Sequence, residues 1–302
     1  MDSSEYKFIV AGHTYGAWSQ SVYPAPLFID FVDSVDQSKY NFCVLLGDIY
    51  RSQEAVDLYY FKTRLLNRFK IPVFNAIGNH DLGKNIPERK VQNYPKYHEE
   101  FTKNTFYSFN IRQIKYIVID SELSNNNGSI DGEQLLFLKS ELENLDPYKS
   151  VIIFCHKELY LFDNNFKKDV LPLMQSAGKK VNQLFFITGD MAKKSDNFYS
   201  YHDEINNIKF VHHHLMDSRK DVIVEFTVNE KDEINLDLIS LISHDKVSFK
   251  NSEQLPIPIS DKVESPSLYT LILSSKKVLI IGFILGAILS CIILWSKKRF
   301  LS

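Results

Sequence analysis

Five short apolar segments of this chain each end abruptly in small and polar residues, and this pattern limits the fold more than any other feature. The segments end in GHTYG (12–16), GDIYR (47–51), GNHD (78–81), FCH (154–156) and TGDMAKK (188–194). Such runs are typical of buried strands, and helix-like sequence separates most of them, which predicts βαβ units and a largely parallel sheet. Because the carboxyl ends of parallel strands meet at one edge, we expect the polar clusters to converge on one crevice.

The globular part of the chain is predicted to span residues 1–250. The chain has 302 residues, of which 44% are hydrophobic, and this is enough for a large core. Its formal net charge is −2, whereas nucleic-acid-binding domains usually carry a basic patch, so we expect no nucleic-acid partner. Beyond residue 205, strand-like segments follow one another without helices, which predicts a second sheet packed against the first.

The C-terminal part of the sequence differs in character. Residues 251–275 are rich in Pro, Ser and charge, which is typical of a linker. Residues 276–297 are predicted to form a transmembrane helix, because Val278–Trp295 is a run of 18 uncharged residues flanked by lysines. Gly282 and Gly286 have the GxxxG spacing of a helix-pairing motif, a candidate homodimer contact. Since the N-terminus lacks the features of a secretory signal, we expect a single-pass tail anchor with the large domain in the cytosol.

The strand ends together supply the side chains that bind divalent metals. They are His13, Asp48, Asn79, His156 and Asp190. Imidazole nitrogens and carboxylate or amide oxygens are common ligands of such ions. The sequence therefore predicts a metal site in the crevice.

At these residues the chain resembles the calcineurin-like metallophosphoesterases, over about residues 6–242. GNHDLG, which begins at Gly78, is similar to the third motif of that family. Asp48 matches the bridging aspartate of the second motif, although Arg51 comes one residue earlier than in the family, and His156 matches the lone histidine of the fourth motif. The resemblance implies an α/β fold, a four-layer α/β/β/α sandwich, ahead of the transmembrane helix.

The first and last motifs depart from the family pattern. His13 stands where the family has an aspartate, and Asp190 stands where it has a histidine. Tyr15 and Ala192 replace the remaining histidines of these two motifs. Tyr15 is a poor ligand because a phenol ionises only near its pKa of about 10. The resemblance assigns one metal position to His13, Tyr15, Asp48 and Ala192. Of these four residues only His13 and Asp48 are plausible ligands, so we expect this position to be empty or to bind metal weakly.

At the other metal position of the family, every matching residue of this chain is a plausible ligand. The resemblance assigns it to Asp48, Asn79, His156 and Asp190, all of which can coordinate an ion. This set of nitrogen and oxygen ligands suits Mn, Fe, Zn or Mg. We therefore expect one intact metal site and a divalent metal ion as the cofactor.

The resemblance also implies roles in catalysis and substrate binding. His80 would donate a proton to the leaving alkoxide, and Asp81 would accept a hydrogen bond from its other ring nitrogen and fix its tautomer. Arg51 and Tyr15 are candidate substrate-binding residues beside the phosphate.

Three hypotheses follow. The leading one is a membrane-anchored, metal-dependent phosphoesterase-like hydrolase that acts on a phosphomonoester, phosphodiester or pyrophosphate, because GNHD, Asp48 and His156 are intact. The alternative is a catalytically degenerate fold that serves as a membrane-tethered binding or scaffold module. In the third, His212 or His214, which would share one face of a strand, completes a second metal site. For His212 and His214 we prefer a simpler interpretation, in which they are ordinary polar residues at the end of a strand.

Overall fold

The computed structural model describes residues 4–16, 24–51, 55–82, 104–123, 129–190 and 197–253. The chain divides into two units, Met1–Ile257 and Pro258–Ser302, and every described residue lies in the first. The predicted linker beyond residue 253 and the predicted membrane helix at 276–297 lie outside the described residues. Within the described part of the chain, no helix has the length and apolar character needed to cross a bilayer.

The first of two six-stranded sheets has the strand order β12-β11-β10-β1-β2-β3. β1, β2 and β3 are parallel to one another, while β10, β11 and β12 continue the sheet in antiparallel fashion. The strands are β1 (Tyr6–Ala11), β2 (Phe42–Leu46), β3 (Val73–Ala76), β10 (Val222–Val228), β11 (Ile234–Ser240) and β12 (Lys246–Val247).

The second sheet has the order β4-β5-β6-β7-β9-β8. Its four central strands are parallel, and an antiparallel strand lies at each edge. The strands are β4 (Tyr107–Ile111), β5 (Ile114–Val118), β6 (Ser150–Cys155), β7 (Gln183–Thr188), β8 (Phe198–Asp203) and β9 (Ile208–His213).

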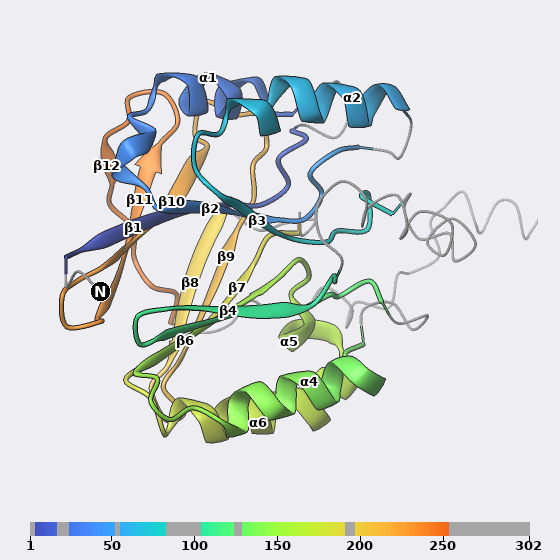
Figure 1. Ribbon diagram of the computed structural model, residues 1–302, viewed down its shortest axis with the longest axis vertical. Helices are drawn as coiled ribbons and strands as arrows, with labels where there is room; N and C mark the ends of the chain where they lie inside the picture. The colour runs from blue at the N-terminus through green and yellow to red at the C-terminus, as the bar shows by residue number, and fades with distance from the viewer. Residues whose placement is uncertain are drawn as a thin grey trace, which may run out of the picture. The chain divides into compact units, whose positions relative to one another are not determined.

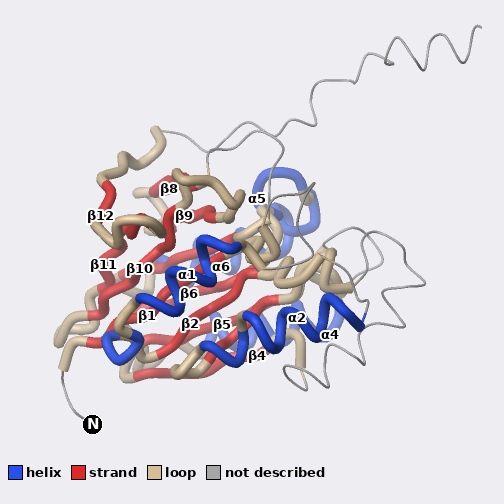
Figure 2. The backbone as a smooth tube through the Cα atoms, turned by 90° about the horizontal axis from the view of Figure 1, so that it is seen from above, coloured by secondary structure: helices blue, strands red, loops and turns tan. Residues whose placement is uncertain are grey.

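Helices cover the outer face of each sheet and complete four layers (Figure 1). α1 and α2 lie over the first sheet, and α4 and α6 lie over the second, as the tube in Figure 2 shows from another side. The α-helices are α1 (Pro26–Ser34), α2 (Ala55–Arg64), α4 (Gly132–Glu143), α5 (Leu159–Phe162) and α6 (Leu171–Gly178). Shorter helical turns are Gln37–Lys39, Leu66–Arg68 and the π-helix Phe166–Val170. The predicted α/β/β/α layering is confirmed for the described residues.

The space between the two sheets is filled largely by aromatic side chains. The ring of Phe8 stacks on that of Phe42 at 4.6 Å and on that of Phe226 at 4.8 Å, and all three are buried. Tyr6 and Tyr116 come from different sheets, and their hydroxyl groups form a buried hydrogen bond of 2.7 Å. Burial of each of these rings contributes about 2–3 kcal/mol by the area removed from water.

The distribution of strands between the sheets differs from the prediction. Sequence analysis assigned the strands before residue 190 to one sheet and the later strands to another. In the structure β9 extends the second sheet beside β7, whereas β10 and β11 join the first sheet beside β1. The reason is that strands such as β2 and β6 are buried on both faces, and such strands have the same apolar sequence in either sheet.

Candidate metal centre

The four residues of the expected intact position come together at the carboxyl ends of four strands. Asp48 and Asn79 follow β2 and β3 of the first sheet, while His156 and Asp190 follow β6 and β7 of the second. Nε2 of His156 lies 3.2 Å from Oδ1 of Asn79, 3.4 Å from Oδ1 of Asp48 and 3.6 Å from Oδ1 of Asp190. Two ligand atoms that bind one ion at 2.0–2.2 Å are at most about 4.4 Å apart. All three separations from Nε2 meet that limit, and the ligand atoms of Asp48, His156 and Asp190 all lie within 4.8 Å of one another.

The protonation of His156 suits a metal ligand. Its Nδ1 lies 2.7 Å from the carbonyl oxygen of Leu46, and since that oxygen only accepts, the proton is on Nδ1. Nε2 of His156 is therefore the ring nitrogen that faces the three oxygen atoms, and a cation there would take the place of any proton that they share. Burial lowers the pKa of His156, but the carboxylates of Asp48 and Asp190 outweigh that effect, and the pKa is raised.

The backbone at this centre is held in an unusual conformation. Asp48 and His13 both lie in the left-handed region, with φ of 51° and 54°, and both are buried. A residue other than glycine held there costs about 1–2 kcal/mol, and the surrounding structure must impose it. Oδ1 of Asp48 accepts a hydrogen bond of 2.9 Å from the backbone amide of His80, which fixes the carboxylate against the GNHD turn.

Two glycines allow the strand ends to approach this closely. A Cβ at Gly78 would lie 2.2 Å from the backbone nitrogen of Asp48, and a Cβ at Gly189 would lie 2.4 Å from Cβ of Leu46. Any side chain at either position would push the loops apart. The glycines of the GN and GD pairs therefore have a packing role as well as a turn role.

His13 faces the second oxygen of Asp48, away from His156. Nε2 of His13 is 3.8 Å from Oδ2 of Asp48, and its Nδ1 is 3.3 Å from the carbonyl oxygen of Leu215. Burial, assisted by nearby imidazoles, lowers the pKa of His13 to about 3, so its ring is neutral. Asp48 thus lies between two histidines, one at each oxygen.

Tyr15 and His80 form the side of the centre next to His13. The hydroxyl of Tyr15 lies 3.4 Å from Nε2 of His80, and its ring lies 4.2 Å from that of His13. Burial and the neighbouring carboxylates raise the pKa of Tyr15, against the weaker opposite effect of Arg51. Tyr15 is therefore a protonated phenol, which agrees with the expectation that it is a poor metal ligand.

The His80 ring and the Asp81 carboxylate each contact the backbone of a neighbouring loop. Nδ1 of His80 lies 3.1 Å from the carbonyl oxygen of Arg51. The carboxylate of Asp81 instead accepts hydrogen bonds from the backbone amides of Ile49, at 2.8 Å, and Gly78, at 2.9 Å. The physical reason is that these buried amides need an acceptor, and Asp81 joins the two loops by supplying it. Half-buried Arg51 contributes its carbonyl to the orientation of His80.

Sequence reasoning missed several buried charged residues beside the centre. Nζ of Lys157 lies 2.5 Å from Oε1 of Glu122, and both side chains are buried. Glu158 is buried next to His212, at 3.3 Å between Oε1 and Nδ1. Lys157 and Glu158 directly follow His156 in the chain, and this adjacency could have indicated that they lie beside the centre. Ala192 lies outside the described residues.

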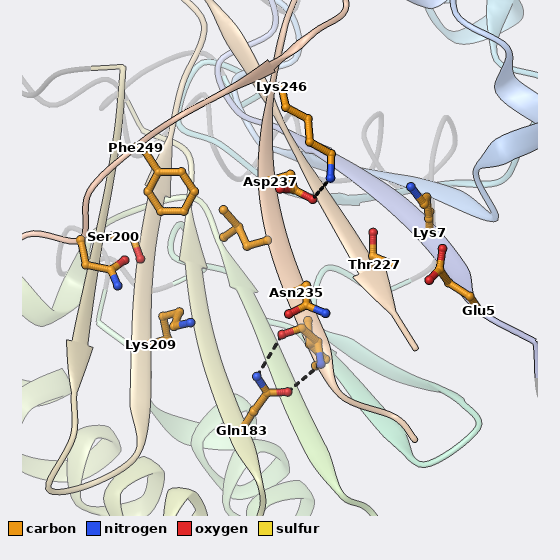
Figure 3. Close-up of a pocket in the computed structure, with 13 residues that line it drawn as sticks. Glu5, Lys7, Gln183, Ser200, Lys209, Thr227, Asn235, Asp237, Lys246 and Phe249 are labelled. Atoms are coloured by element: carbon orange, nitrogen blue, oxygen red, sulfur yellow. Dashed lines mark hydrogen bonds and ion pairs between the residues drawn. The ribbon is translucent and has the colours of Figure 1, made fainter. Parts of the chain in front are cut away.

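Among the described residues, one group of at least three His, Cys, Asp or Glu side chains brings its ligand atoms within 4.8 Å of one another. It consists of Asp48, His156 and Asp190. A separate groove of about 680 Å³ lies elsewhere, between the edges of the two sheets (Figure 3). Its walls include Gln183, whose side chain bonds the backbone of Ile234, and no candidate ligand lines it. The candidate function therefore depends on the buried centre and not on the groove.

Comparisons with known proteins agree with this arrangement at the level of the fold. No protein-family model matches the sequence, and no curated protein matches it. Among solved structures, a purple acid phosphatase from yellow lupin seeds superposes with a TM-score of 0.62 at 13% identity, over 82% of this chain. The present chain spans about half of that protein, 53% of its length. An uncharacterised protein of Streptococcus pneumoniae, described as a predicted phosphoesterase, matches with a TM-score of 0.38 at 10% identity, over 81% of this chain and 94% of its own. The two sheets, their helical layers and the likeness to the lupin enzyme show that this chain has the metallophosphoesterase fold.

Proposed function

We propose that this protein is a metal-dependent hydrolase of phosphate esters, with one divalent cation held by Asp48, Asn79, His156 and Asp190. The observation that carries the proposal is the position of His156 Nε2, which lies within 3.6 Å of one oxygen of each of the other three residues. One nitrogen and three oxygens suit Mn, Fe, Zn or Mg. A cation bound there supplies positive charge that stabilises a transferring phosphoryl group.

His80 is the proposed proton donor to the leaving group. The carbonyl oxygen of Arg51 lies 3.1 Å from Nδ1 and holds a proton on that nitrogen, so the ring is oriented with Nε2 toward Tyr15 and the centre. When the ring is protonated, Nε2 carries the proton that a leaving alkoxide requires. The Tyr15 hydroxyl, 3.4 Å from Nε2, is placed to position this ring and to contact a substrate oxygen.

The chemistry of the proposed centre supports a phosphate ester or a pyrophosphate as the substrate. A phosphomonoester, a phosphodiester and a pyrophosphate all present a phosphoryl group with anionic oxygens, and a cation with a neighbouring proton donor serves each of them. The side chain of Arg51 is a candidate contact for the same oxygens, since guanidinium groups bind phosphate in a bidentate manner.

The test begins with metal binding by the full-length chain, purified in mild detergent and freed of ions with a chelator. Mn²⁺ or Zn²⁺ is then titrated by calorimetry into the wild type and into His156→Gln and Asp190→Asn. His244→Gln is the control, because His244 lies far from the centre along the chain and bonds Ser34. Hydrolysis of p-nitrophenyl phosphate, bis-p-nitrophenyl phosphate and pyrophosphate follows with the loaded protein. Tight binding lost in both variants, with turnover of one substrate, supports the proposal. Absence of binding in the wild type would favour the scaffold alternative.

We also propose a membrane tether at residues 276–297, with the large domain in the cytosol and the GxxxG of Gly282 and Gly286 as a dimer contact. The sequence supports it through the 18 uncharged residues between flanking lysines. Alkaline extraction of membranes from expressing cells, together with protease protection, tests it. Release of the protein at high pH would contradict the tether, and protection of the large domain would contradict the orientation.

A further inference from the structure

A groove of about 680 Å³ lies between the edges of the two sheets, and none of the four proposed metal ligands lines it. Most of the residues that line it are polar or charged. A cavity of this size holds a small organic molecule, and a polar wall favours a polar molecule over a lipid or an apolar side chain. The groove is therefore a candidate binding site that is separate from the metal centre.

Three of the described lysines line the groove, and they differ in how their charge is balanced. Nζ of Lys7 lies 3.1 Å from Oε1 of Glu225, and Nζ of Lys246 lies 2.7 Å from Oδ2 of Asp237. Lys209 forms no ion pair with any residue in the described ranges. Its ammonium group is therefore the positive charge in the groove that an anion can neutralise.

The ammonium group of Lys209 is only partly hydrated. The side chain is half-buried, and Nζ lies 5.3 Å from the centroid of the Phe185 ring. The face of an aromatic ring attracts a cation less strongly than a carboxylate does. Burial lowers the pKa of Lys209 because it removes water from the charged form. An anion that reaches this group is therefore attracted more strongly than it would be at an open surface.

Ser200 supplies a hydroxyl group beside Lys209. In the β8–β9 register Ser200 lies opposite Val211, two residues along β9 from Lys209. The two side chains are therefore diagonal neighbours on one face of the sheet, with backbones about 7–8 Å apart. Val211 belongs to the core between the sheets, so this face points into the space between them.

The hydroxyl of Ser200 is buried, and its Oγ has no hydrogen-bond partner within the described part of the chain. A buried polar group without a partner is unfavourable, and such groups are rare in folded proteins. An anion held by Lys209 would supply the missing acceptor, since the long lysine side chain allows both groups to reach one phosphate or carboxylate.

We propose that the groove binds a small polar anion, whose phosphate or carboxylate group is held by the ammonium of Lys209 and the hydroxyl of Ser200. Figure 3 shows both residues on the same side of the groove as Phe249, away from Lys7. The ring of Phe249 is held against that of Phe198, with centroids 4.9 Å apart, and offers a fixed apolar contact to the body of the ligand. The inference does not rest on the proposed function, because no proposed metal ligand takes part.

Calorimetric titration of the full-length protein tests the inference, with inorganic phosphate as the probe in one arm and succinate in the other. A chelator is present, so that phosphate does not bind through a metal ion at the centre. The wild type should bind one anion per chain, and the tighter of the two probes shows which anionic group is recognised. Lys209→Met should weaken binding about tenfold, because a charge-assisted hydrogen bond is lost. Ser200→Ala should weaken it less.

Lys220→Met is the matched control and should bind as the wild type does. It removes the same charge from an exposed residue that does not line the groove. Removal of the half-buried Lys209 ammonium is not expected to prevent folding, because the charge has no ion-pair partner among the described residues to leave behind. Asp190→Asn should also keep the anion.

Two results would overturn the inference and leave the proposed function intact. One is no binding of either probe by the wild type, and the other is equal weakening in Lys209→Met and Lys220→Met, which would reduce the effect to general attraction between charges. A measurement on the wild type covers the case in which a variant does not fold. The better probe should slow acetylation of Lys209 by acetic anhydride, as located by mass spectrometry, and leave that of Lys220 unchanged. Unchanged acetylation of Lys209 at saturation contradicts the inference.

Discussion

Lys157 and Glu122 form a buried ion pair, with 2.5 Å between Nζ and Oε1, at the edge of the candidate metal centre. Burial lowers the pKa of Lys157, but Glu122 and the carboxylates of the centre outweigh it, so the pKa is raised and the ammonium is retained. The pair therefore places a fixed positive charge beside a group of acidic residues.

Lys157→Met should lower the free energy of unfolding by about 3–5 kcal/mol, because it leaves Glu122 buried without its partner. The double variant Glu122→Gln with Lys157→Met should recover much of that loss. Urea denaturation of the metal-free protein measures both. A loss below about 1 kcal/mol in the single variant would mean that the pair is not buried in solution.

Gly78→Ala should lower both stability and cation affinity. The added methyl group would lie 2.2 Å from the backbone nitrogen of Asp48, so the loop that carries this ligand must move. Overpacking of this kind costs about 1–3 kcal/mol. Gly132→Ala is the control. No atom lies within 4 Å of its added methyl group, and its positive φ alone costs about 1 kcal/mol. Calorimetric titration should find weaker binding in the first variant and unchanged binding in the second.

Tyr15→Phe should leave the cation content unchanged, because the phenol is protonated and does not act as a ligand. The variant removes the hydroxyl 3.4 Å from Nε2 of His80, so stability should fall by about 0.5–1.5 kcal/mol. The hydrolytic rate should fall with it, since His80 loses a positioning contact. Elemental analysis of the loaded variant is the decisive measurement, and loss of an ion would make Tyr15 a ligand.

Buried neutral His213 should contribute stability to the metal-free protein that is lost as the pH is lowered below about 6.5. Burial lowers the pKa of His213 from 6.5 to about 3. Between these values the unfolded chain binds a proton that the folded chain does not, so the free energy of unfolding decreases by about 1.4 kcal/mol per pH unit for this residue. Above pH 6.5 the residue contributes no pH dependence.

His213→Gln retains a donor for the carbonyl of Val222 and removes the titrating ring. Its free energy of unfolding should change less steeply than that of the wild type between pH 6 and pH 4.5, by roughly one proton. Urea denaturation at several pH values in the presence of a chelator gives both slopes. Equal slopes would show that His213 is not neutral and buried in solution.

The sequence was most informative where several short motifs had to agree. The strand-end positions of Asp48, Asn79, His156 and Asp190 and the layered fold are confirmed, because buried strands and their glycine-rich ends leave a clear local pattern. The sequence could not show which sheet β10 and β11 join, because strands with mainly apolar sequence fit either sheet.

Contacts between distant side chains were also beyond the sequence. Asp81 adjoins His80 in the chain, yet its carboxylate binds backbone amides of another loop. The pairing of Lys157 with Glu122 joins the ends of β6 and β5, and no local pattern marks it. Such partners depend on how the strand ends meet in space, which periodicity does not specify.

The four proposed ligands of the cation come equally from the two sheets, two following β2 and β3 and two following β6 and β7. An ion held by all four would be a cross-link between the halves of the sandwich, in addition to the aromatic packing and the hydrogen bonds between the two sheets. Ligand binding to the folded form alone raises its stability with the logarithm of the free ion concentration. The lifetime of the folded domain in a cell would then depend on the concentration of free metal ions around it.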